Sequence, residues 1–417
     1  MSDGPSADEV RAEVRAWLSG HWDPERPLAE WRADLADSGW GCPTWPRPHG
    51  RGLPAPLGRV VADELRAAGA VGPAIGVGMS LAAPTLLAHG SDDLQRRLLR
   101  RIVTGEDTWC QLFSEPGNGS DLAGLTTHAR RDGDEWAVSG QKVWTTGAHH
   151  AAYGMLLART DWDVPKHRGI SFFAFPMRQP GVEVRPLRQM NGRASFNEVF
   201  LDDARVPHAN VVGEVNGGWA VALTTLAHER GLAAGLFGAL PPPGGGRTRD
   251  EATAEATAYL RTYEWYPQRA GRADLVPTRA RAEGLGADPL VRQLVSHVAA
   301  TERTARLTAD RAAAARRAGR PPGPEGSIGK LAASRIAREA AAAHGHIAGA
   351  HGMLTGPGSP EGGIVAEVLV SVPGASIAGG TDEIQHNIIG ERVLGLPKEP
   401  SVDADRPFRD VEVNRRG

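Results

Sequence analysis

The chain has 417 residues, and its 47 Lys and Arg nearly balance its 49 Asp and Glu, which gives a formal net charge of −2 at pH 7. This length exceeds one ordinary hydrophobic core, so we expect two or three domains. The charge balance disfavours a nucleic-acid partner. The two cysteines, Cys42 and Cys110, are too few for a disulfide framework and lack the paired spacing of a zinc site.

The N-terminal sequence MSDGPSADEVRAEVRAWL is acidic and polar, whereas a secretory signal would carry a basic and then an apolar region. The one long uncharged run, 67–90, is interrupted by several Gly and Pro residues, which is typical of buried helices joined by turns. We therefore expect a cytoplasmic protein without a membrane span.

In chain order, helical periodicity comes first, with Val10, Val14, Trp17 and Leu18 on one face of a predicted helix. After residue 108, short runs rich in Val and Phe, such as GISFFAFPM and SFNEVFLDDARVP, predict strands. Helices are expected again at 216–240, 250–270, 287–318, 327–350 and 383–395.

This order predicts an α+β protein with an N-terminal helical domain, a middle β domain, a C-terminal helical domain and a short tail, at 1–107, 108–215, 216–400 and 401–417. A doubly wound parallel sheet would need regular alternation of strands and helices, and that alternation is missing. The sequence PPPGGG at 241–246 is expected to end a helix, because proline lacks the backbone N–H.

Two apparent motifs do not carry chemistry. GPEGSIGKL resembles a phosphate loop, but Pro324 occupies a required glycine position and Leu331 stands where a hydroxyl should hold magnesium. His344, His346 and His351 have no carboxylate or thiol among them, and the surrounding glycines are typical of a helix end. We therefore predict no metal site.

Two other segments are suggestive together. QLFSEPGNGSDLAGL, at 111–125, has glycines that permit close approach of a ligand, beside the hydroxyls of Ser114 and Ser120. In SGQKVWTTGAHHA, Trp144 and Thr146 lie two residues apart, so in a regular strand they share one face. An aromatic surface beside a hydroxyl suits a planar ring with a polar edge, although Trp144 alone is more typical of a half-buried core residue.

These blocks, with EVRPLRQMNGRASFNEVFLDDARVPHANVVGEVNGGWAVALTTLAHERG, GAHGM and SIAGGTDEIQHNIIGERVLGLP, resemble the acyl-CoA dehydrogenase family over nearly the whole chain. The resemblance implies an N-terminal helical domain, a middle β-barrel-like domain and a C-terminal four-helix bundle. It also implies FAD between the β domain and the bundle, an acyl-CoA or carrier-bound thioester substrate, and at least a homodimer, or a homotetramer.

The resemblance further implies which residues contact FAD. Trp144 is expected against the flavin ring, Thr146 near N5 and Ser114 near the pyrimidine end, and Ser120 also matches a CoA contact. Arg281 or Arg279 is expected to replace the arginine of an Arg-x-x-Phe-Gly motif that is not legible here. The full set of expected FAD contacts comprises Gln111, Phe113, Ser114, Gly119, Ser120, Trp144, Thr145, Thr146, Arg281, His346, Gly349, Gly352, Thr381 and Glu383, of which the segment from His346 to Gly352 is expected to reach a neighbouring subunit's FAD.

The family oxidises an acyl thioester by removing an α-proton with a carboxylate while the β-hydrogen leaves as hydride. Many relatives carry that Glu immediately before the Gly-Thr of the C-terminal motif, where this chain has Gly379. The branch resembling isovaleryl-CoA and long-chain acyl-CoA dehydrogenases uses a Glu-Arg pair instead, which here is Glu229 and Arg230. Glu229 is thus the expected base, Arg230 a support for the base and CoA, and the backbone N–H of Gly379 a donor to the thioester oxygen.

The sequence therefore predicts an FAD-dependent acyl-CoA dehydrogenase that passes electrons to an electron-transferring flavoprotein. One alternative is a flavin monooxygenase on the same fold, which needs no carboxylate base. Another is a non-catalytic subunit of a heteromeric dehydrogenase. Acyl chain length and the role of the 241–285 insert stay open.

Overall fold

The computed structural model describes residues 4–232, 241–318, 323–400 and 403–411. Contacts within the chain define two compact units. The first comprises Met1–Leu187, Ser195–Thr262 and Val402–Gly417, and the second Arg188–Ala194 and Tyr263–Ser401. Among the helices of the described ranges, none combines the length and apolar character needed to cross a membrane.

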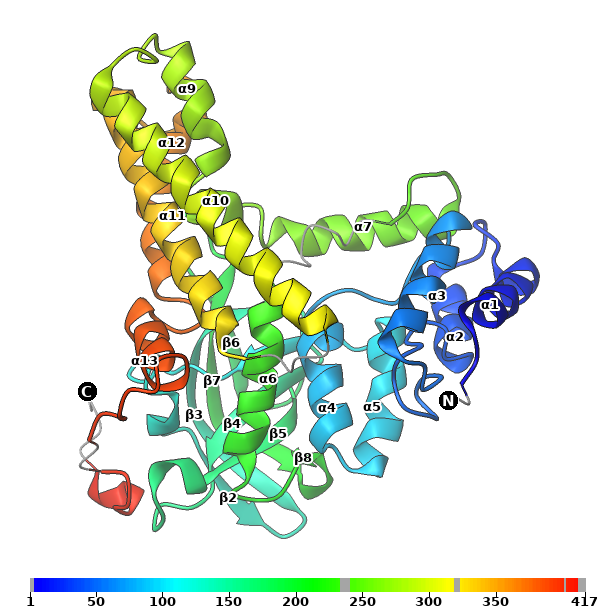
Figure 1. Cartoon of the computed structure of the whole chain (residues 1–417). Coiled ribbons are helices and arrows are strands. Elements are labelled where there is room, and N and C mark those ends of the chain that lie inside the picture. The colour runs from blue at the N-terminus through cyan, green and yellow to red at the C-terminus, as the bar shows by residue number, and fades with distance from the viewer. Residues whose placement is uncertain (1–3, 233–240, 319–322, 401–402, 412–417) are drawn as a thin grey trace. The chain divides into compact units, whose positions relative to one another are not determined.

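The described N-terminal part of the first unit is helical, with α1 (Ala7–His21), α2 (Leu28–Asp37), α3 (Ala55–Ala67), α4 (Ala83–His89) and α5 (Asp92–Thr104) (Figure 1). Ser6 and Glu9 form a capping box at the start of α1, which satisfies backbone N–H groups that the helix cannot. The expected apolar face is confirmed, since Val10, Val14 and Leu18 are buried in one core with Trp31.

The middle of this unit is a β-sheet, which confirms the predicted β region. Its strands are β1 (Trp109–Leu112), β2 (His128–Asp132), β3 (Glu135–Thr146), β4 (Tyr153–Arg159), β5 (Ile170–Pro176), β6 (Val182–Leu187), β7 (Phe196–Pro207) and β8 (Val211–Val212). The strand order is β6-β7-β3-β2-β4-β5-β8, with β1 paired parallel to β4. The long β3–β7 pair is antiparallel and shifts register twice, once between Lys142 and Thr145.

Helix α6 (Gly218–Leu232) packs against α4 and β5 (Figure 1). At its first residue, Gly218, a Cβ would lie 2.5 Å from the carbonyl carbon of Ser171, so only glycine allows this approach. A buried hydroxyl pair, Thr85 and Thr225, joins α4 to α6 at 2.9 Å. The helix was expected over 216–240, and residues 233–240 lie outside the described ranges.

Helix α7 (Arg247–Arg261) lies in the insert whose role the sequence left open. It docks on α2, where the guanidinium of Arg32 lies 2.6 Å from the carboxylate of Glu255 and the N–H of Leu28 donates to Glu251 at 2.8 Å. The insert therefore contributes a helix that is packed on the N-terminal region of its own unit.

The second unit is helical, as expected, with α8 (Tyr266–Arg269), α9 (Val276–Ala282), α10 (Pro289–Arg317), α11 (Glu325–Ala348), α12 (Ile364–Ser371) and α13 (Asp382–Arg392). Helices α10 and α11 run side by side (Figure 1). Small residues such as Ala340 and Ala343 on α11 pack with Val291 and Val298 of α10, which permits close helix contact. These bounds confirm the predicted helices at 287–318, 327–350 and 383–395 to within three residues.

Candidate active site

Glu229 lies on the packed face of α6, eight residues after buried Val221 and four after buried Thr225. The amide Nε2 of Gln111, on β1, donates a hydrogen bond to Oε2 of Glu229 at 3.1 Å. This bond orients the half-buried carboxylate through one of its oxygens, and a carboxylate held in this way is a group that can act as a general base. A carboxylate among small apolar residues is thus held in a defined position.

The segment after β1, Phe113–Glu115, is fixed to β3 by a buried ion pair. Nζ of Lys142, with an exposed fraction of 0%, lies 2.9 Å from Oε1 of Glu115 and donates to the carbonyl of Phe113 at 3.1 Å. Burial by itself would raise the pKa of Glu115, but the Lys142 charge and backbone N–H donors lower it to about 2. The backbone N–H of Val143 also donates to the carbonyl of Ser114 at 2.9 Å.

Trp144 has a strained backbone, with φ at +63°. A bulky residue rarely adopts this left-handed conformation, and strain of this kind costs about 1–3 kcal/mol. The indole is 56% exposed and meets Phe196 edge to face, with centroids 5.7 Å apart. The regular alternation expected through Trp144 and Thr146 is interrupted here, because the register shifts between Lys142 and Thr145.

The neighbouring threonines have different surroundings. Thr145 is fully buried, and its hydroxyl has no hydrogen-bond partner among the described residues. Thr146 is half-buried and lies two residues after the exposed indole of Trp144. A ligand against Trp144 could therefore meet the hydroxyl of Thr146, whereas Thr145 could contribute only its backbone.

The loop 116–125 follows Glu115 and carries the expected contacts Gly119 and Ser120, both exposed, while Ser114 before it is half-buried. A Cβ at Gly119 would meet nothing within 4 Å, so protein packing does not require glycine there. The base of the loop is fixed, because Glu115 accepts hydrogen bonds from the N–H groups of Thr126 and Thr127 at 2.7 and 2.8 Å.

Three family models match consecutive parts of the chain. They are described as the N-terminal, middle and C-terminal domains of acyl-CoA dehydrogenase, and they match residues 6–106, 110–204 and 273–394. Acyl-CoA dehydrogenase IpdE1 of Mycobacterium tuberculosis is 34% identical over 410 residues, which cover 94% of this chain and 98% of that protein. The chain belongs to the acyl-CoA dehydrogenase family. It is an oxidoreductase of that family, and the family implies a flavin cofactor.

Other similar proteins differ in length or assembly. Acyl-CoA dehydrogenase FadE34 of the same organism is 39% identical over 364 residues, which cover 87% of this chain but 46% of that protein, so the chain spans about half of its length. The solved structure titled Tcur3481-Tcur3483 steroid ACAD has a TM-score of 0.64 at 27% identity and covers 96% of this chain and 100% of that chain. The ChsE4-ChsE5 complex from Mycobacterium tuberculosis has a TM-score of 0.60 at 29% identity, with the same coverage.

The β domain of this acyl-CoA dehydrogenase family member has features that fit a flavin. An indole ring is held open to solvent on strained backbone, with a hydroxyl, that of Thr146, two residues further on. The adjoining 113–115 backbone is anchored by buried Lys142, so it is rigid before any ligand binds. Trp144, Thr146 and the Phe113–Ser114 backbone are thus the residues that would hold the ring.

The C-terminal motif lies in the second unit. Gly379 is exposed with φ at +69°, and a Cβ there would meet nothing within 4 Å. Thr381 caps α13, since its hydroxyl accepts from the N–H of Ile384 at 3.3 Å, and Glu383 is exposed in the first turn of that helix. The motif therefore combines an open glycine turn with a capped helix start.

Arg281 is exposed on α9, whereas its neighbour Arg279 is buried. The guanidinium of Arg279 donates to Glu361 at 2.6 Å and to Nδ1 of His344 at 2.8 Å. Nε2 of His344 lies 3.0 Å from the carbonyl of Arg272, and burial lowers the pKa of this imidazole, so His344 is neutral with its proton on Nε2. Arg279 is thus engaged within its own unit.

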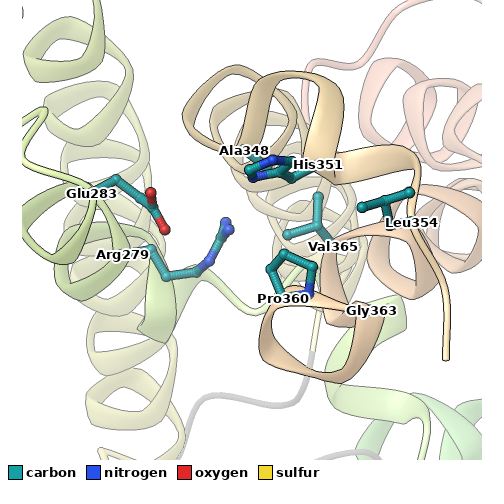
Figure 2. A pocket seen from close by; sticks show the side chains of 8 residues that line it. All are labelled: Arg279, Glu283, Ala348, His351, Leu354, Pro360, Gly363 and Val365. Carbon is teal, nitrogen blue, oxygen red and sulfur yellow. The ribbon is translucent and has the colours of Figure 1, made fainter. Parts of the chain in front are cut away.

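A small cavity lies beside Arg279. Figure 2 shows Arg279 and Glu283 on one side and His351, Pro360 and Val365 on the other. Its volume is about 20 Å³, which is room for about one water molecule and not for a cofactor. Nearby, His346 and Gly349 are exposed, and Gly352 is buried against Val365.

The sequence prediction missed Glu115, Lys142 and the contact between Gln111 and Glu229, although both members of the ion pair lie inside the quoted motifs. A signal was available, because a lysine in a strand with buried neighbours needs a charged partner. The side chain of Arg230 lies outside the described residues, and its expected role stays a prediction. Within the described ranges no group of three or more His, Cys, Asp or Glu could hold a metal ion.

Proposed function

We propose that the chain catalyses FAD-dependent α,β-dehydrogenation of an acyl-CoA or another acyl thioester to the trans-2-enoyl thioester. The observation that supports this most is Glu229, a half-buried carboxylate that Gln111 holds by a 3.1 Å hydrogen bond, in a chain whose C-terminal motif has Gly379 in place of a base. Glu229 on α6 is therefore the carboxylate that we propose as the base.

The chemistry requires a positioned base because the α-proton of a thioester is a weak acid. In this proposal Glu229 removes that proton, and Gln111 keeps its carboxylate oriented through the step. The backbone N–H of Gly379 donates to the thioester oxygen, a contact that needs no side chain. When bound, FAD would supply the hydride acceptor, and Trp144 and Thr146 would hold its ring. Ser120 and Arg230 would bind the CoA portion of the substrate.

A second candidate is that the chain is one component of a heteromeric dehydrogenase. Two of the similar structures carry titles that pair two named proteins, and the similar FadE34 is about twice as long as the matched chain. For the homomeric form we propose a homodimer or homotetramer, with an electron-transferring flavoprotein as acceptor. The presence of Glu229 disfavours a flavin monooxygenase, which needs no base.

The test is the visible spectrum of the purified protein, followed by anaerobic addition of a thioester panel. The panel contains straight-chain, branched, alicyclic and steroid side-chain acyl-CoAs, since similar proteins are named for alicyclic and steroid substrates. We expect flavin absorbance that one class of thioester bleaches. A colourless protein that does not take up FAD at micromolar concentration would favour the heteromeric candidate, and bound FAD that no thioester reduces would contradict dehydrogenation.

A further inference from the structure

Arg159, the last residue of β4, is a fully buried cation with an unusual environment. Its guanidinium donates to the carbonyls of Ala123 at 2.7 Å, Leu125 at 3.2 Å and Lys166 at 3.1 Å. No carboxylate of the described residues lies within 4.0 Å of it, unlike the paired ammonium of Lys142. The cation is thus stabilised by peptide dipoles, two of which belong to the loop 116–125.

The C-terminal segment covers this cation. The ring of Phe408, 1% exposed, has its centroid 3.5 Å from Cζ of Arg159, which is close cation–π contact. The N–H of Phe408 donates to the carbonyl of Val164 at 2.9 Å, and that of Arg409 to Trp162 at 3.0 Å. Residues 403–411 are therefore seated on the β domain of their own unit and seal Arg159 from water.

A second contact joins the same segment to the same loop. Nζ of Lys166 lies 3.1 Å from the carboxylate of Asp121 and 3.6 Å from that of Asp403. The loop itself is tightly folded, since a Cβ at Gly124 would lie 2.7 Å from the side-chain oxygen of Asn118. The C-terminal segment and the loop thus both contact Arg159. They also both contact Lys166, through Asp403 of the segment and Asp121 of the loop.

We propose that residues 403–411 form a C-terminal latch that positions the loop 116–125 for the CoA portion of the substrate, with Phe408 and Arg159 as positioning residues. The proposal rests on the function proposed above, because Ser120 of that loop is the expected CoA contact. Arg159 transmits the effect, since it binds the carbonyls at 123 and 125, three and five residues after Ser120.

The latch acts by excluding water from the guanidinium of Arg159. Burial lowers the pKa of Arg159 to about 10, so it remains charged at neutral pH while having lost its hydration. Without the Phe408 ring, water reaches the guanidinium and competes with the loop carbonyls for its N–H donors. The loop then opens more often. Substrate binding must close it again, and this cost weakens the binding of substrate.

The test compares Phe408→Ala, Phe408→Leu and Phe408→Trp, with Asp410→Asn as the matched control from the same turn, where Asp410 is exposed. Amide hydrogen–deuterium exchange over 116–127 is measured without ligand, and KM and kcat are measured with an accepted acyl-CoA. Because a cation–π contact is worth on the order of 1 kcal/mol, we expect about fivefold faster exchange at 119–125 and about fivefold higher KM in Phe408→Ala, with kcat nearly unchanged.

Phe408→Leu retains apolar volume without the aromatic face and is expected to be intermediate. Phe408→Trp keeps an aromatic face but overpacks this closed site, so it is also expected to be intermediate, while Asp410→Asn should match the wild type. Wild-type exchange at 119–125 in Phe408→Ala would overturn the latch, as would faster exchange spread evenly over β2 to β5, which indicates general destabilisation. If no thioester is turned over by the wild type, the proposed function fails, and the exchange measurement still decides whether the latch exists.

Discussion

The candidate residues of the first unit lie on backbone that other side chains hold in place, whereas those of the second unit lie mostly at exposed turns and helix ends. Glu229 is bound by Gln111, and the 113–115 backbone by Lys142. Gly379 and Glu383, by contrast, are exposed. The candidate residues of the first unit are therefore held in position before any ligand binds, so substitutions there should separate effects on activity from effects on stability.

The largest expected effect is on the base. Glu229→Gln should slow flavin reduction by about 10²–10⁴-fold without loss of FAD, because an amide cannot accept the α-proton. Anaerobic stopped-flow bleaching by an accepted acyl-CoA measures this rate. The matched control is Glu214→Gln, an exposed Glu in the same unit, which should behave as the wild type.

Position 379 is a glycine, so a carboxylate introduced there tests whether the base can be supplied from the C-terminal motif. Glu229→Gly combined with Gly379→Glu should recover part of the rate if both positions address the α-carbon. The new side chain has space, but φ at +69° strains it, so recovery is expected to be partial. A double variant as slow as Glu229→Gly alone would contradict the claim that positions 229 and 379 both address the α-carbon.

The next effect is on stability. Glu115→Gln leaves the Lys142 ammonium buried without its carboxylate, which should cost about 3–5 kcal/mol of unfolding free energy. The control in the second unit is Asp274→Asn, whose carboxylate is exposed and pairs with Arg272 at 2.8 Å. Because water can solvate both groups after the change, we expect a loss of at most about 1 kcal/mol. Urea unfolding followed by tryptophan fluorescence compares the two variants, and equal losses would contradict the contrast between the units.

The same pair predicts a pH dependence. The pKa of Glu115 falls from 4.5 to about 2 on folding, so its carboxylate stabilises the fold above pH 4.5 and this contribution is lost as the pH falls toward 2. The unfolding midpoint of the wild type should therefore decline over this window more steeply than that of Glu115→Gln.

The smallest expected effect on stability is at Trp144. Trp144→Gly relieves the left-handed strain, so the protein without flavin should be as stable as the wild type or up to about 1 kcal/mol more stable. Its dissociation constant for FAD should rise about tenfold, because the exposed ring is lost. Asp203→Gly, at another left-handed position with φ at +52°, is the control and should leave FAD affinity unchanged. Unchanged affinity in Trp144→Gly would remove this indole from the site.

Much of the fold was predictable because periodicity is a local property of the chain. The helix expected at 287–318 is Pro289–Arg317, and the apolar face of Val10 and Val14 is buried. Contacts between distant residues were not predictable in this way, and Gln111 and Glu229 are 118 residues apart. Nor could alternation reveal the register shift before Trp144, because a bulge depends on the pairing strand β7.

The central claim is that Glu229 removes the α-proton, and the most direct test is exchange of that proton with solvent. The protein is incubated anaerobically in D₂O with an accepted acyl-CoA, and deuterium at the α-carbon of recovered substrate is measured by mass spectrometry. We expect α-deuteration by the wild type and a rate lower by about 10²-fold or more in Glu229→Gln. Exchange at the wild-type rate in Glu229→Gln would contradict the role of Glu229 as the base.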